Sequence, residues 1–233
     1  VFAQSCSSPL RLGGGAKLRR LNDVRRNKPH CSASAMAQIL SDIKRNGIPD
    51  LTNRNSLREA RNVVAGAHGA YGPILQTIEC LDIAGGTKTI PIASPFASLS
   101  AAVSESDSFR CFVKQQILRH PPSPEQPWSI ILYSDEVTPG NPLTISNKRM
   151  FQSIYWSFKE FDTTALSHEE TWFVLLTEYS TCINAFPGGL SQVFAAAIHS
   201  FFMPDGLHMM DRGIGLDIDG RGFRTFAKLG VAL

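Results

Sequence analysis

Two adjacent carboxylates, Asp135 and Glu136, are the residues of this 233-residue chain best suited to metal chemistry. They follow an apolar run at 130–133 that is long enough for one buried strand. A charge at the end of a buried strand needs a partner or a metal ion, and carboxylate oxygens are ligands that Mg²⁺ prefers. The pair therefore predicts a Mg²⁺ site with Asp135 as the catalytic acid and both residues as ligands. The structural alternative is that Asp135 caps the Pro-Gly turn at 138–141 through its side chain.

A complete two-metal site needs a second acid, because such sites hold two ions about 4 Å apart between carboxylates. Asp217 and Asp219 are the nearest candidates late in the chain, but both lie in or beside an expected turn, where Asp is common anyway. The histidines show no His-x-x-x-His spacing, and the chain has neither a Gly-x-Ser-x-Gly elbow nor a Walker-type loop. Nucleophilic catalysis and nucleotide binding therefore have no support.

An aromatic-rich segment at 151–161 has two interpretations. Tyr155, Trp156, Phe158 and Phe161 could stack nucleobases. Core packing is the simpler interpretation of the same residues.

The basic side chains are concentrated at the beginning of the chain. Residues 1–35 carry seven of them against one acid, Asp23, so this segment has a net charge of +6 and the remainder a net charge of −3. With no sustained apolar period, the segment is expected to lack a stable fold. It is expected to be a solvated linker, a non-specific nucleic-acid-binding arm or an organelle-targeting segment. The candidate nucleic-acid-binding residues are Arg11, Lys17, Arg19, Arg20, Arg25, Arg26 and Lys28.

Composition limits the location of the protein. No apolar run reaches the roughly 18 residues of a membrane span, so no membrane association is expected. The five cysteines are scattered and form no Cys-x-x-Cys pair, which argues against zinc and against a disulfide scaffold. We expect reduced thiols and a nuclear or cytoplasmic protein, with organelle targeting left open.

Hydrophobic periodicity predicts an α+β fold with two folded domains. The first, residues 36–120, is expected to be a small helix-helix-hairpin-helix domain. Four prolines within 121–127 predict an extended linker. The second domain, residues 128–233, is expected to contain a three-strand meander, a helix and a final hairpin. The expected elements of the two domains lie at 36–46, 56–64, 74–92 and 95–119, and at 130–134, 151–161, 171–179, 190–202, 214–218 and 223–233.

Several blocks of the sequence resemble a known family. They are Tyr-Ser-Asp-Glu-Val-Thr-Pro-Gly-Asn at 133–141, Tyr-Trp-Ser-Phe at 155–158, Gly-Leu-Ser-Gln-Val-Phe at 189–194 and Phe-Ala-Lys-Leu at 226–229. They resemble an uncharacterised protein family that is repeated in many copies in dinoflagellate genomes. That family is similar to the catalytic, ribonuclease-H-like region of cut-and-paste DNA transposases, which carry an aspartate just before a Gly-Asn-Pro-Leu turn. On this resemblance Asp135 matches the first metal-binding acid.

The resemblance implies a transposon-derived protein with an incomplete ribonuclease-H-like domain. Longer family members continue past the last strand into a segment where the second acid is expected, so this chain resembles a truncated copy. The implied cofactor is Mg²⁺ at a half-complete site, the implied partner is DNA, and no nuclease activity is expected. The alternative is a non-catalytic nucleic-acid or protein-interaction module that binds through residues 1–35.

Overall fold

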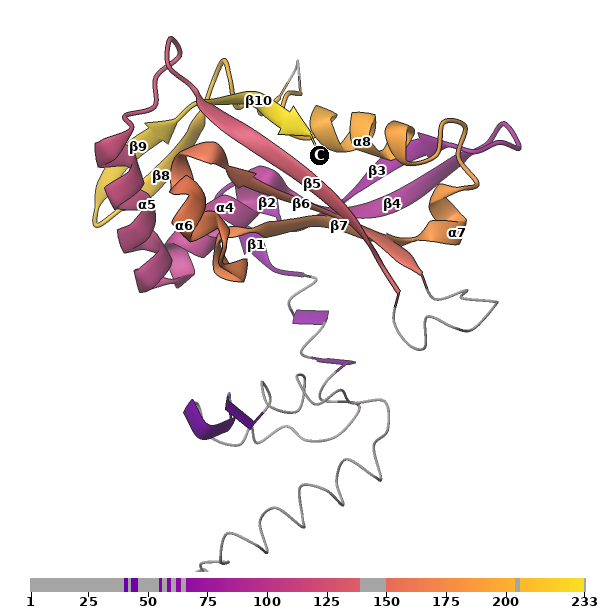
Figure 1. Cartoon of the computed structure of the whole chain (residues 1–233), viewed down its shortest axis with the longest axis horizontal. Helices are drawn as coiled ribbons and strands as arrows, with labels where there is room; N and C mark the ends of the chain where they lie inside the picture. Colours follow the sequence, from indigo (N-terminus) through magenta and orange to yellow (C-terminus); the bar gives the residue numbers. More distant parts are fainter. Residues whose placement is uncertain are drawn as a thin grey trace, which may run out of the picture. The chain divides into compact units, whose positions relative to one another are not determined.

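The computed structural model divides the chain into two compact units, Val1–Leu57 and Arg58–Leu233. It describes residues 66–138, 150–203 and 206–232, with a few single residues between 40 and 63. The basic segment 1–35 lies outside the described residues, as does most of the helices expected at 36–46 and 56–64. The second unit is a mixed α and β structure with several small sheets (Figure 1).

The largest sheet has four strands in the order β10-β5-β6-β7. Strands β5, β6 and β7 follow one another in an antiparallel meander, and β10 lies parallel to β5 on its other edge. Strand β5 is therefore hydrogen-bonded on both sides. The strands are β5 (Trp128–Val137), β6 (Phe151–Phe158), β7 (Phe173–Tyr179) and β10 (Ala227–Ala232).

Three antiparallel hairpins accompany this sheet. The hairpin expected near residues 74–92 is confirmed, with Leu75 paired to Ala93 and Leu81 to Thr87. The hairpins are β1 (His68–Gly69) with β2 (Gly72–Pro73), β3 (Leu75–Leu81) with β4 (Thr87–Ala93), and β8 (Ile214–Ile218) with β9 (Arg221–Thr225).

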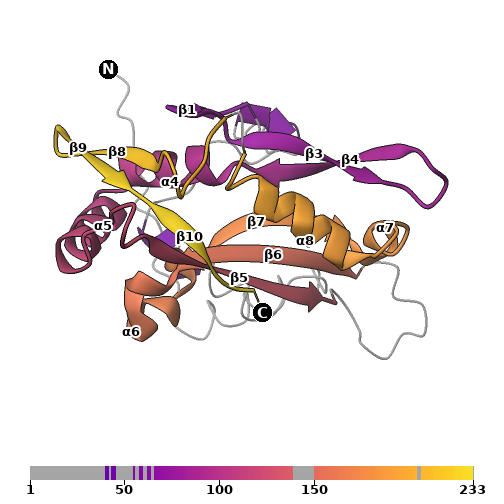
Figure 2. The same cartoon turned by 90° about the horizontal axis from the view of Figure 1, so that it is seen from above.

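The helices are short, and most lie beside the sheets. The helix expected at 190–202 is observed as α8, which lies alongside the β3–β4 hairpin on one side of the large sheet (Figure 2). The helices are α4 (Pro95–Glu105), α5 (Asp107–Arg119), α6 (Asp162–Leu166), α7 (Ser180–Ile183) and α8 (Leu190–His199), with short 3-10 turns η1 (Lys159–Phe161) and η2 (Glu169–Thr171).

The helical segment expected at 95–119 consists of two helices. Ser106 has extended backbone angles, with φ −115° and ψ 108°, which end α4. Its hydroxyl then accepts a hydrogen bond from the Phe109 amide at 3.3 Å and caps α5. A serine inside an otherwise helical apolar pattern is therefore a boundary here.

Two strand predictions need correction. The strand expected at 130–134 runs from Trp128 to Val137, so Asp135 and Glu136 lie within β5 and not beyond its end. The final strand expected at 223–233 is two strands. Its first part, β9, pairs with β8, and its second part, β10, leaves that hairpin and pairs with β5.

One hydrophobic core connects both sides of the proline-rich segment 121–127. Ile90 and Phe96 belong to the same cluster of buried residues as Trp156 and Phe158, and all four are 0% exposed. The indole of Trp128, just after the segment, donates a hydrogen bond to the carbonyl oxygen of His120 just before it, at 2.7 Å. The segment lies inside the second unit, and the packing gives no support to a domain boundary there.

A shared core predicts that damage in the first half reaches the second half. Phe96→Ala should destabilise the whole unit by about 3–5 kcal/mol, because it leaves a cavity in a fully buried site. Amide hydrogen exchange should accelerate in β5 and β6 as well as in α4. Leu118→Ala, on an α5 side chain that is 67% exposed, is the control and should change stability little. Protection that falls only in residues before 121 would mean that two independent domains exist.

Candidate functional site

Strand β5 presents two different faces because successive side chains of a strand point to opposite sides. Ile130 and Leu132 point into the core and are 0% exposed. Tyr133 is 41% exposed, and Asp135, two residues further along the same face, is also exposed. Asp135 therefore lies on the open face of the sheet.

The two carboxylates predicted as one metal site are not brought together. Asp135 pairs with Ser153 of β6 and faces outward, whereas Glu136 is on the opposite side of the strand. There the Glu136 carboxylate accepts a hydrogen bond of 2.7 Å from the hydroxyl of Ser180, at the beginning of α7. A single ion therefore cannot bind both side chains without a change in the strand.

Asp135 lines an open pocket of about 810 Å³ on the outer face of β5, β6 and β7. Its described lining combines two acids, three aromatic rings and one aliphatic side chain: Asp135, Glu169, Tyr133, Tyr155, Trp172 and Val174. The acids and the aromatic rings come from segments about 15 to 40 residues apart. The pairing of β5, β6 and β7, with the turn η2 that leads into β7, places them together. Among the described residues, neither Asp135 nor Glu169 takes part in an ion pair.

The aromatic rings of the pocket have a defined arrangement. Tyr133 and Tyr155 are direct cross-strand partners, and their rings are near-parallel, with centroids 6.3 Å apart and planes 27° apart. The Trp172 ring stands at 62° to Tyr133, with centroids 6.4 Å apart. Its indole N–H donates to the carbonyl oxygen of Leu166 at 2.9 Å, which holds the ring in place. We refer to the tyrosine pair as the floor of the pocket and to the Trp172 ring as its wall.

Most of the aromatic segment considered for base stacking belongs to the core. Trp156, Phe158 and Phe161 are 0% exposed, and Trp156 packs on Phe201 with ring centroids 5.2 Å apart. The core interpretation is confirmed for these three residues. Tyr155 alone of the four lies on the open face, because it alternates with Trp156 along β6.

The late acids Asp217 and Asp219 have structural roles in the β8–β9 hairpin. Asp219 and Gly220 have φ of 54° and 75°, as a two-residue hairpin turn requires. The Asp217 carboxylate accepts a hydrogen bond from the Gly220 amide at 2.9 Å. The position of Asp219-Gly220 in the turn agrees with the sequence pattern.

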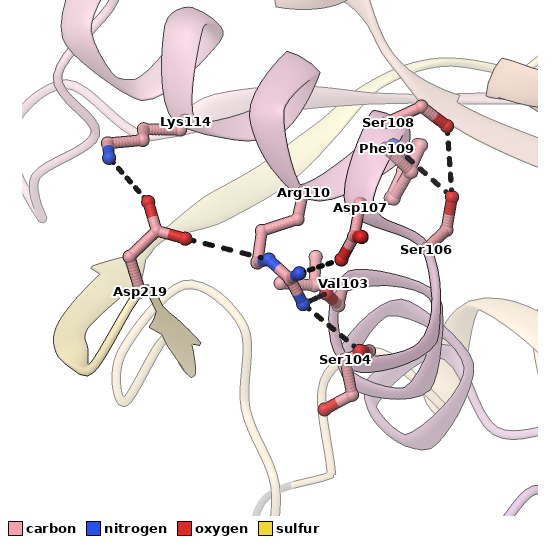
Figure 3. Close-up of polar contacts among 9 residues, drawn as sticks. All are labelled: Val103, Ser104, Ser106, Asp107, Ser108, Phe109, Arg110, Lys114 and Asp219. Carbon is pink, nitrogen blue, oxygen red and sulfur yellow. Dashed lines mark hydrogen bonds and ion pairs between the residues drawn. The ribbon is translucent and has the colours of Figure 1, made fainter.

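Asp219 also connects its hairpin to helix α5 (Figure 3). The Lys114 ammonium lies 2.5 Å from one carboxylate oxygen of Asp219, and the Arg110 guanidinium lies 3.6 Å from the other. The hydrogen bond and charge of Lys114, with the charge of Arg110, hold the pKa of Asp219 below its ordinary value. Arg110 also pairs with Asp107 in its own helix.

Few other groups in the described residues could bind a metal ion. No cluster of three or more His, Cys, Asp or Glu side chains occurs within the parts of the chain that the structure describes. Cys182 accepts a hydrogen bond from the Lys88 ammonium at 2.7 Å, and Cys80, Cys111 and Cys182 are free thiols. The seven basic residues proposed to bind nucleic acid lie outside the described residues. Within the described residues, no helix has the length and apolar character that a membrane crossing requires.

Comparison with protein-family models, with curated proteins and with solved structures gave no match.

The low pKa of Asp219 predicts a pH-dependent contribution to stability. Because its pKa is lowered in the folded state, Asp219 stabilises the fold above its unfolded pKa of about 3.9, and this contribution is lost as pH falls through the folded pKa. Asp219→Asn should lower the urea midpoint at pH 7, and the difference from wild type should shrink as pH falls below about 4. Asparagine tolerates positive φ, so the turn is preserved and the charge alone is tested.

Glu105→Gln, on an exposed side chain of α4 that forms no ion pair with another described residue, is the matched control. It should leave the midpoint unchanged across the same pH range. An Asp219→Asn difference that stays constant down to pH 2 would rule out the ion-pair explanation.

Proposed function

We propose that residues 128–232 are a ribonuclease-H-like domain of transposase descent, in a protein that binds DNA without cutting it. The strand order carries the proposal. An antiparallel meander β5-β6-β7 is followed by helix α8, and the chain then returns as β10, parallel to β5 and beside it. This is the order of meander, helix and further strand that the resemblance to transposase catalytic regions implies. Asp135 lies on the first strand of the meander, where the first metal-binding acid is expected.

The positions of the acidic side chains argue against DNA cleavage. Asp135 and Glu136 face opposite sides of β5, and Asp217 and Asp219 serve the β8–β9 hairpin. Glu169 is the other described acid in the pocket of Asp135. Mg²⁺ bound at Asp135 would supply charge to hold a phosphate, but it keeps most of its waters when one or two carboxylates bind it. We therefore propose no phosphodiester cleavage.

Charge supports DNA as the partner. The net charge of +6 in residues 1–35 is the electrostatic pattern of a non-specific phosphate-binding arm. The rest of the chain is net negative, but β9 and β10 carry exposed cations, Arg221, Arg224 and Lys228. These residues give the folded unit a second, weaker site for the DNA backbone.

Charge neutralisation in the full chain measures how much each of these two parts contributes to the affinity for DNA. Changing the seven basic residues of 1–35 to Gln should weaken binding of a fluorescent duplex at least about a hundredfold at low salt. The slope of log affinity against log salt should become smaller by up to about six, since each lost phosphate contact contributes about 0.9. Fluorescence anisotropy measures both quantities.

Residual affinity separates the transposase-derived domain from the alternative of a module that binds through its basic segment alone. We expect the neutralised variant to keep weak binding that Arg221→Gln with Lys228→Gln removes. Complete loss of binding on neutralising residues 1–35 would favour the module that binds through its basic segment alone. The observation that supports this alternative is the net charge of +6 in residues 1–35 against −3 in the rest of the chain. No binding by the unmodified chain at low salt would refute both proposals.

A cleavage assay tests the catalytic part of the proposal. We expect labelled single- and double-stranded DNA to remain intact with Mg²⁺ or Mn²⁺ at millimolar concentration. Metal-dependent cleavage that Asp135→Ala abolishes, and that Glu170→Gln retains, would show that the proposal of a non-cleaving domain is wrong. Gel electrophoresis of the labelled strands gives the result directly.

A further inference from the structure

The pocket on the open face of β5, β6 and β7 has a chemistry that DNA binding does not explain. Its described lining holds two carboxylates, Asp135 and Glu169, beside three aromatic rings and no cationic side chain. A DNA backbone would be repelled by the two acids. We propose that this pocket binds the guanidinium group of an arginine side chain from a protein partner.

The floor of the pocket matches a planar cation. Tyr133 and Tyr155 both line the pocket, and their rings are near-parallel, with centroids 6.3 Å apart and planes 27° apart. A guanidinium group is planar, is weakly hydrated and stacks on aromatic faces, where the ring quadrupole attracts its charge. The Trp172 wall, set by its hydrogen bond to the carbonyl of Leu166, limits the position of the alkyl stem beside Val174.

The acids provide the rest of the recognition. Asp135 lies on the same face of β5 as Tyr133, two residues away, so its carboxylate borders the tyrosine floor. Glu169 precedes the Trp172 wall by three residues, and the Trp172 amide donates to the Glu169 carbonyl oxygen at 3.0 Å. A guanidinium group has five N–H donors in a fixed fork, which suits bidentate binding to one carboxylate with a second carboxylate nearby.

Other occupants fit less well. A lysine ammonium is compact and strongly hydrated, so it gains less than a guanidinium group from contact with the tyrosine rings. A nucleobase would stack on the tyrosines, but its phosphates would approach Asp135 and Glu169. Mg²⁺ would leave the aromatic lining unused, because it prefers oxygen ligands and its own waters.

The three tryptophans provide the readout. Trp128 and Trp156 are 2% and 0% exposed in the core, so only the indole signal of Trp172 should respond to a ligand in the pocket. The isotope-labelled full chain is titrated with acetyl-Gly-Gly-Arg-Gly-Gly-amide. Two further peptides replace its arginine with lysine or with citrulline, an uncharged isostere of arginine. We expect the arginine peptide to shift the Trp172 indole signal with a dissociation constant of about 1 mM.

The citrulline peptide should bind at least about tenfold more weakly, and the lysine peptide about threefold more weakly. Asp135→Asn and Tyr133→Leu should each weaken arginine binding about fivefold or more. Glu169→Gln should weaken it as well, whereas Glu170→Gln, its neighbour outside this pocket, should not. All four positions are exposed, and the unchanged Trp128 and Trp156 signals verify that each variant folds.

Three results would overturn the proposal. Equal binding of the citrulline peptide would make the pocket an apolar site. A saturable Trp172 shift with oligothymidylate would make it a nucleobase site. A shift with Mg²⁺ alone that Asp135→Asn removes and that blocks the arginine peptide would make it a metal site. The proposal does not depend on DNA binding by residues 1–35, so failure here leaves the duplex-binding result unchanged.

Discussion

The burial of one face of β5 is the constraint on which the rest of the structure depends. Ile130 and Leu132 are 0% exposed on that face, opposite Phe158 and Trp156 of β6, so a one-residue shift would turn them all outward. This register decides which face of the strand each acid occupies. It places Asp135 on the open face and leaves Glu136 on the core side, beside Ser180. The same register pairs Tyr133 with Tyr155 and so creates the aromatic floor.

The position of β10 depends on contacts far from its own sequence. The hairpin β8–β9 precedes it, and Asp219 at the turn of this hairpin pairs with Lys114 and Arg110 of α5. After the hairpin, the Trp128 amide donates to the carbonyl of Phe226 at 2.8 Å, which aligns the beginnings of β10 and β5. Asp219, which the sequence offered as a second metal-binding acid, therefore helps instead to assemble the sheet that carries the pocket of Asp135.

Local patterns were enough for much of the fold. The alternation at 74–92, the apolar stripe of α8 and the Asp-Gly turn each depend on residues close in sequence, and each gave a correct element. Three features depend on partners that a sequence does not identify. Ser106 divides a helix that the apolar period alone would continue, β10 leaves its hairpin for β5, and residues on both sides of 121–127 belong to one core.

The candidate site was only partly predictable for the same reason. Asp135 was identified from its place after an apolar run, but Glu169 and Trp172, in and just after η2, join it only through the folding of η2 and β7 against β5 and β6. The original reason for choosing Asp135 also changes. A buried carboxylate needs a partner, whereas an exposed one is solvated and can remain without one. Asp135 is exposed, so its presence needs no metal ion, and its surroundings become the better guide to its role. Three aromatic rings beside two carboxylates favour an organic cation over a hydrated metal ion, because the ring faces attract positive charge, whereas Mg²⁺ prefers oxygen ligands and keeps its own waters.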